Sequence, residues 1–277
     1  MRGCACRGTA GFAHVSCLAE QAKILCDEAE ENNLGQKAFN ERWARWYSCG
    51  LCEQDYHGVV ACALGWACWK TYVGRPESDP VRMSAMRQVA NGLAAVDHDE
   101  DALTVEEAQL SLMRRLGYSE EGLLTMQENL AVSYARLGRV EEALLMQRDV
   151  YSGRMKLDGE EHARTFLAAN NMASSLMHLQ RFGEVKALLR KRVPVVLRVF
   201  GEGNNLTLKM RKIYAQALYK DAAVTLADLH EAVTTLEDVG RIAQQVLGGS
   251  HPFTKRSENE VQNARLALLV ESNRRYL

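Results

Sequence analysis

Two stretches decide the fold: residues 129–143, NLAVSYARLGRVEEA, and residues 171–185, NMASSLMHLQRFGEV. The second begins 42 residues after the first and repeats its Asn-apolar-Ala start and its Glu-apolar end. The same frame fits residues 89–102 and, with a five-residue insertion, residues 214–232. A period of this length predicts stacked pairs of amphipathic helices, because no single pair can bury its own apolar stripe.

A second marker confirms the period independently. Three segments run from a glycine to a threonine: residues 159–165 (GEEHART), 201–207 (GEGNNLT) and 248–254 (GGSHPFT). They are 42 and 47 residues apart, so the five-residue insertion appears in this marker as well. Each repeat is therefore expected to be two helices and a turn.

Small residues recur at matching positions in the repeats and predict close contact between the helices. They lie at Ala90, Ala131, Ala173 and Ala215 on the first helices, and at Ala102, Ala143 and Ala232 on the second. The pattern resembles the tetratricopeptide repeat (TPR), particularly the 42-residue kinesin-light-chain type with a Gly-x-x-His-Pro-x-Thr loop. The resemblance covers about residues 81–270 and implies a mainly α fold, an α-solenoid of helix pairs over residues 79–277.

Six residues near the N-terminus have metal-ligand spacing: Cys4-x-Cys6, His14-x-x-Cys17 and Cys49-x-x-Cys52. Thiolate and imidazole are ligands that zinc prefers. The order, with seven residues between Cys6 and His14, resembles the RING-CH zinc domain. That resemblance predicts a small zinc-binding module, a partial RING-CH domain over residues 1–56, with Zn²⁺ as its cofactor.

The RING-CH resemblance also implies how the ligands would pair. Cys4, Cys6, Cys49 and Cys52 would form one complete site. His14 and Cys17 would form half of a second site, whose opening Cys-x-x-Cys is expected before Met1. Such domains bind a ubiquitin-conjugating enzyme, so the resemblance also implies a possible RING-type E3 ubiquitin ligase, which supplies no nucleophile of its own.

The other cysteines suggest a different role. Cys26, Cys62 and Cys68 lie in apolar helical context and are expected to pack in the core. Eight cysteines in 277 residues are not disulfide-dense, and no secretory leader precedes them. We therefore expect a reducing compartment and an intracellular, cytoplasmic protein.

The segment before the repeats is predicted to be helical. Residues 16–31 have apolar periodicity, residues 37–46 are expected to form a second helix, and residues 57–78 are interpreted as a connecting helix and turn. Trp66, Trp69 and Tyr72 are either a binding ridge or core, and core packing is the favoured interpretation. Asp79 is expected to cap the next helix, with Pro80 in its first turn.

Composition limits the classes of function. The formal net charge is −1, with 25% charged residues, so the basic field of a generic nucleic-acid binder is missing. The cluster Arg190-Lys191-Arg192 reads as a solvated helix face. The longest apolar run, residues 58–69, is too short for a bilayer, which needs about 20 residues.

In the TPR resemblance the first helices line a concave groove that holds a peptide or a partner helix. Carried over by position, the groove residues are Asn129, Arg136, Asn171, His178, Lys212, Gln216 and Lys220, with Lys209 on the same wall. Asn129 and Asn171 would hydrogen-bond the peptide backbone, and the converging cations would favour an acidic peptide. Ordinary exposed polar positions remain the alternative.

No catalytic constellation is evident. Gly201-Glu202-Gly203 lacks the strand and the lysine of a phosphate loop, and the histidines are scattered. The sequence therefore favours a protein–protein interaction adaptor with a partial zinc module. The alternative is a RING-CH-type E3 ubiquitin ligase in which the repeats select the substrate.

Overall fold

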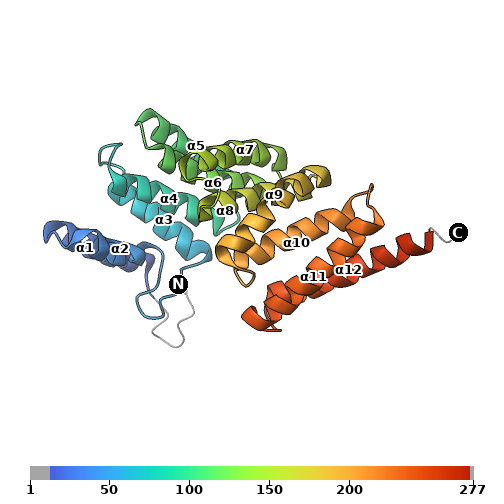
Figure 1. Cartoon of the computed structure of the whole chain (residues 1–277). Helices are drawn as coiled ribbons and strands as arrows, with labels where there is room; N and C mark the ends of the chain where they lie inside the picture. The colour runs from blue at the N-terminus through green and yellow to red at the C-terminus, as the bar shows by residue number, and fades with distance from the viewer. Residues whose placement is uncertain (1–12, 275–277) are drawn as a thin grey trace. The chain divides into compact units, whose positions relative to one another are not determined.

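The computed structural model describes residues 13–274, and the regular elements in that range are helices (Figure 1). The chain divides into two compact units, residues 1–126 and 127–277, and the boundary lies inside α6 (Glu120–Arg136). Unit 1 contains α1 (Val15–Glu31), α2 (Gly35–Trp43), the short 3₁₀ helix η2 (Ala44–Trp46), α3 (Gly58–Tyr72), α4 (Pro80–Ala94) and α5 (Asp99–Arg115). Unit 2 contains α7 (Val140–Leu157), α8 (Ala163–His178), α9 (Phe182–Phe200), α10 (Asn205–Lys220), α11 (Leu226–Leu247) and α12 (Pro252–Arg274).

The first helices of unit 1 pack around an aromatic cluster. Trp43, Trp46 and Tyr72 are buried, and the Trp43 and Tyr72 ring centroids lie 5.5 Å apart. Cys26 and Cys68 are fully buried in the same cluster, as expected for core thiols, and burial raises the pKa of the Cys68 thiol. Core packing is thus the role of Tyr72, and Trp69 packs against this cluster, whereas Trp66 stays 42% exposed.

Two glycines allow α3 and α4 to touch through their backbones. A Cβ on Gly65 would lie 2.4 Å from the carbonyl oxygen of Gln88, and one on Gly92 would lie 2.9 Å from the Cα of Cys62. Any side chain at either position would force the helices apart. The α4 start is the predicted one: Asp79 Oδ1 accepts hydrogen bonds from the Val81 and Arg82 amides, at 2.7 and 3.2 Å.

The repeats are helix pairs, as the 42-residue period predicts. In unit 2, α8 packs on α9, α10 on α11, and each of α8 and α10 also packs on the preceding second helix. First helices lie next to one another, α8 beside α10 and α10 beside α12. The predicted small positions are all buried, between 0% and 4% exposed: Ala90, Ala131, Ala173, Ala215, Ala102, Ala143 and Ala232.

The glycine-to-threonine marker has a local structural cause. Gly159, Gly201 and Gly248 have φ angles of 88°, 75° and 84°, which glycine adopts without steric cost. A side chain then caps the next helix: His162 Nδ1, Asn204 Oδ1 and His251 Nδ1 accept an amide hydrogen bond two residues on. Two of the threonines close the loop, because Thr165 Oγ1 donates to the Gly159 carbonyl and Thr254 Oγ1 to the Gly248 carbonyl.

The five-residue insertion is divided between the turn from α10 to α11 and the first turn of α11. The turn from α10 to α11 spans residues 221–225, and α11 is 22 residues long. A capping box at Thr225 and Asp228 starts α11. Within residues 13–274, every helix is too short or too polar to cross a lipid bilayer.

Candidate functional site

A pocket of about 430 Å³ lies between the first helices of two successive repeats in unit 2. We call it the α6–α8 pocket; it is lined by Val132, Ala135, Arg136, Val140, Gln147, Asn171, Ser174, Ser175 and His178. Three of the predicted groove residues, Arg136, Asn171 and His178, therefore meet here. Each comes from a first helix, whereas Val140 and Gln147 come from α7 behind them.

A buried arginine ties together the helices that form this pocket. The Arg154 guanidinium on α7 is fully buried and donates to both carboxylate oxygens of Glu128 on α6, at 3.0 and 3.2 Å. It also donates to Asp158 Oδ2 at 3.4 Å. The Arg154 carbonyl accepts a hydrogen bond from Thr165 Oγ1 on α8 at 3.3 Å. One residue thus holds α6, α7 and α8 in register.

The lining of the α6–α8 pocket has a defined chemical character. Val132 offers an apolar surface, 44% exposed, and Arg136 and His178 are exposed basic groups. No carboxylate is among the lining residues. Gln147 is only 5% exposed, and its Oε1 has no hydrogen-bond partner in the described part of the chain.

A second pocket, of about 410 Å³, lies on the other side of α8. This α8–α10 pocket is lined by Ala163, Arg164, Leu167, Asn170, Phe200, Asn204, Asn205, Leu206 and Lys209. Its charged side chains, Arg164 and Lys209, are both basic. Leu167 is 44% exposed, and the buried Oδ1 of Asn170 has no partner among residues 13–274. Both pockets therefore combine exposed apolar surface, basic groups and a buried amide oxygen that no group in the described range pairs with.

The remaining predicted groove residues lie outside the linings of these two pockets. Asn129 is exposed on α6. Lys212 is half-buried with its Nζ 4.9 Å from the centre of the Phe253 ring on α12, and desolvation lowers its pKa. Gln216 is half-buried on α10, and Lys220 Nζ lies 5.6 Å from the Tyr219 ring centre. A role for these four residues in peptide binding stays a prediction.

In the cluster Arg190-Lys191-Arg192 the first two residues are exposed, as the sequence-based interpretation expects, and Arg192 is not. Arg190 Nε donates to Tyr214 Oη at 3.4 Å. The Arg192 side chain is only 13% exposed, lies over the Tyr151 ring and pairs with Glu160. Two of the three cations therefore have structural contacts, which a linear reading of charge does not reveal.

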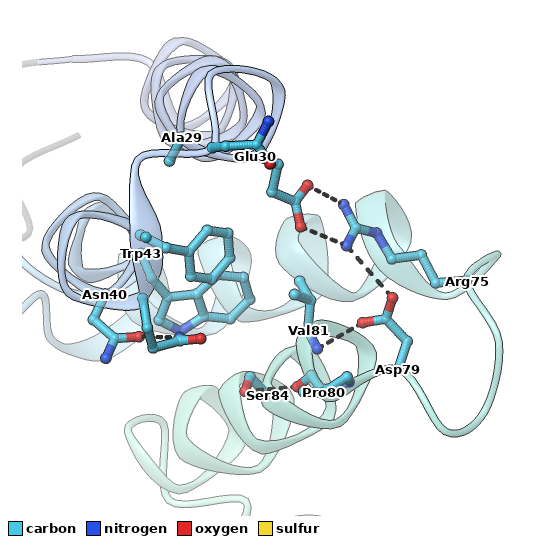
Figure 2. Close-up of a pocket in the computed structure, with 13 residues that line it drawn as sticks. Ala29, Glu30, Asn40, Trp43, Arg75, Asp79, Pro80, Val81 and Ser84 are labelled. Atoms are coloured by element: carbon cyan, nitrogen blue, oxygen red, sulfur yellow. Dashed lines mark hydrogen bonds and ion pairs between the residues drawn. The ribbon is translucent and has the colours of Figure 1, made fainter.

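Unit 1 has a pocket of about 520 Å³ between α1, α2 and α4 (Figure 2). Figure 2 shows Arg75 reaching between two carboxylates, with its Nη1 and Nη2 2.9 and 2.6 Å from the Glu30 oxygens and Nη1 3.5 Å from Asp79. Trp43 and Phe39 form its apolar wall, with ring planes 23° apart. Because these charged groups are paired with one another, their role is to stabilise the packing around the pocket.

The predicted zinc ligands are described only in part. Cys4 and Cys6 lie outside the described residues. His14 Nδ1 and Cys17 Sγ are 3.9 Å apart, close to the roughly 3.6 Å between two such ligands of a tetrahedral zinc. Cys49 and Cys52 share a tight turn in which the Leu51 amide points at Cys49 Sγ, 3.5 Å away. Zinc binding by these residues stays a prediction.

The backbone of the same turn is unusual. Glu53, directly after Cys52, has a φ of 56°, a left-handed conformation uncommon for a residue with a side chain. Its amide donates to the Cys49 carbonyl at 3.0 Å, and Ser48 pairs with Asp55 in an isolated bridge. Among residues 13–274, however, no group of three or more His, Cys, Asp or Glu is placed to hold a metal ion.

Sequence reasoning missed Gln147 and Asn170. A signal for Gln147 does exist in the repeat frame. Moving 42 residues forward from Gln147 gives Leu189, and the next repeat has Leu236; both leucines are fully buried. The preceding repeat has Glu106 at this position, so an amide where the two following repeats have buried leucine is the signal that could have drawn attention to this pocket.

Comparisons with known proteins agree with the repeat fold. Residues 123–163 match the family profile described as tetratricopeptide repeat. No curated protein matches the sequence. Two crystal structures of a kinesin-light-chain-type protein from Podosopora anserina, with nearly identical TPR-like repeats, are similar at TM-scores of 0.56 and 0.55. Each is 19% identical to this chain; they cover 85% and 84% of it and 99% and 98% of their own lengths. The chain therefore has the fold of a TPR-like helical solenoid and contains a recognisable tetratricopeptide repeat at residues 123–163.

Proposed function

We propose that this chain is a protein-binding scaffold whose second unit holds an extended, acidic segment of a partner protein across α6, α8 and α10. One observation carries the proposal: the two pockets flanking α8 contain basic residues and no carboxylate, although the net charge of the chain is −1. The basic groups are Arg136 and His178 in one pocket, and Arg164 and Lys209 in the other.

The chemistry of the pockets suits an extended peptide. Val132 and Leu167 would lose exposed apolar surface when covered, which favours association. An extended chain has unpaired backbone amides, and Asn170 Oδ1 is an acceptor for which the described part of the chain offers no donor. Carboxylates on the peptide would be attracted to the basic groups, so affinity should fall as salt rises.

Selection from a displayed library of random peptides against the full chain tests this proposal. Peptides rich in Asp and Glu should be enriched. Lys209 is exposed and lines the α8–α10 pocket, so Lys209→Glu should weaken the selected peptides about tenfold, or about 1.4 kcal/mol.

Lys191→Glu is the charge-matched control, because Lys191 is exposed on α9 and lines neither pocket. Its variant should bind the same peptides with unchanged affinity. Selected peptides without acidic enrichment would refute the proposal, and so would equal affinities for the two variants.

We also propose that the N-terminal cysteines bind zinc, because a specific feature favours it. The Leu51 amide can stabilise a thiolate at Cys49, and the left-handed Glu53 lets the chain turn back after Cys52. Zinc would link Cys49 and Cys52 to Cys4 and Cys6, the other ligands that the RING-CH resemblance implies. The E3 ligase alternative, with a ubiquitin-conjugating enzyme as partner, requires this module to be intact, since such catalysis is positioning.

Zinc stoichiometry of the purified full chain tests the metal proposal. One zinc per chain is expected, and Cys49→Ser should remove it. Cys62→Ser is the control, because Cys62 is half-buried on α3 and packs against apolar core residues. A chain without zinc would overturn the proposal, and two zincs would contradict a single complete site.

A further inference from the structure

We propose that Gln147 makes the α6–α8 pocket selective for a partner side chain that carries a neutral hydrogen-bond donor. Such a donor is a hydroxyl, an amide or an indole N–H. This inference rests on the proposed function, because it specifies one position of the acidic segment that unit 2 binds.

The first step is the state of the Gln147 amide. The side chain lines the pocket, the residue is only 5% exposed, and Oε1 is buried without a hydrogen-bond partner in the described chain. A buried polar atom without a partner destabilises a fold, because it has lost water and gained nothing in return. A donor from a ligand would satisfy it.

The second step is that packing alone does not require an amide here. In the two following repeats the same position is Leu189 in α9 and Leu236 in α11, both fully buried core residues, whereas the preceding repeat has Glu106 in α5. Gln147 belongs to the second helix of its pair, behind the first helices that form the walls. A peptide main chain crossing α6 and α8 would pass over the walls, so a side chain is what reaches Gln147.

The basic lining of the pocket restricts the charge of the side chain that can enter. Arg136 and His178 line the same pocket, and they disfavour an ammonium or guanidinium group. An acidic side chain would be attracted to those residues but would bring no proton to the Gln147 oxygen. A neutral donor is not repelled by Arg136 and His178, and it brings a hydrogen to the Gln147 oxygen. The acidic residues of the segment would flank it.

The test uses the acidic peptides selected against the full chain. At one peptide position, replacing a donor side chain with its matched non-donor, Ser with Ala, Thr with Val or Tyr with Phe, should weaken binding at least tenfold. Gln147→Met keeps the shape of the side chain and removes the amide. In that variant the same replacement should change affinity less than twofold.

A second readout does not involve peptide. Removing an unpaired buried amide should raise the melting temperature of Gln147→Met by about 3 °C or more. Gln109→Met is the contrast. The Gln109 Oε1 also lacks a hydrogen-bond partner among residues 13–274, but its Nε2 donates to the Met83 carbonyl at 3.3 Å, and the residue lines none of the pockets described above. The methionine would lose that hydrogen bond, so this variant should gain less stability than Gln147→Met.

The outcomes separate this inference from the proposed function. If Lys209→Glu weakens the peptides while Gln147→Met keeps the donor preference or melts lower than the wild type, the inference is wrong and the acidic groove stands. If no acidic peptide binds, both fail.

Discussion

Removing the carboxylate of Glu128 should destabilise unit 2 strongly. The Arg154 side chain is 0% exposed and Glu128 is 14% exposed, so the pair is shielded from water. Deleting one partner of a buried pair costs about 3–5 kcal/mol, because the other charge stays buried. Asp158 Oδ2 remains 3.4 Å from Arg154 Nη1 and compensates in part. We therefore expect a loss of about 3 kcal/mol for Glu128→Ala, at the lower end of that range.

Urea unfolding followed by circular dichroism measures this loss, read from the transition that the variant shifts. The control is Glu161→Ala, which removes the partner of Arg198 in a pair whose side chains are 50% and 65% exposed. Exposed pairs contribute about 0–1 kcal/mol, so the control should barely move. Equal losses for the two variants would refute the claim that burial makes the Arg154 pair important.

Two further perturbations have matched controls or internal checks. Gly65→Ala should destabilise the chain by about 3 kcal/mol in urea unfolding, because the new Cβ would lie 2.4 Å from the Gln88 carbonyl oxygen. Its control is Gly183→Ala, which adds a Cβ in open space and should be neutral or stabilising by up to about 1 kcal/mol. The hydrogen bond from Thr225 lowers the folded-state pKa of Asp228, so its stabilisation is present above about pH 4 and is lost as pH falls through the folded-state pKa. Asp228→Asn should therefore be less stable than the wild type at neutral pH and equal to it near pH 2; a difference that persists in acid would contradict this.

The repeat architecture was predictable from the sequence because its signals are local and recur. A glycine with positive φ and a capping His or Asn mark each of the three glycine-to-threonine segments. The phase of the repeat could therefore be determined from these segments as well as from the helices. The buried alanines follow from the same frame. Repetition lets weak local preferences reinforce one another, which is why the helix pairs appear where the period places them.

The pockets were only partly predictable, because they depend on contacts distant in sequence. The repeat frame identified Arg136, Asn171 and His178, but it could not show that Lys212 stacks on Phe253 of the following first helix. It also missed Gln147, because a sequence does not show that a buried amide oxygen lacks a hydrogen-bond partner within residues 13–274. The backbone contact at Gly65 was likewise unpredictable, since a glycine in a helix has no sequence mark of what it touches.

The most direct test of the central claim is to locate where a bound acidic peptide lies. A selected peptide with a photo-crosslinking side chain can be irradiated on the full chain and the attachment sites found by mass spectrometry. The account predicts attachment on α6, α8 and α10, close to Val132 and Leu167. Attachment to unit 1, or to the outer face of α7 around the exposed Leu145, would contradict it.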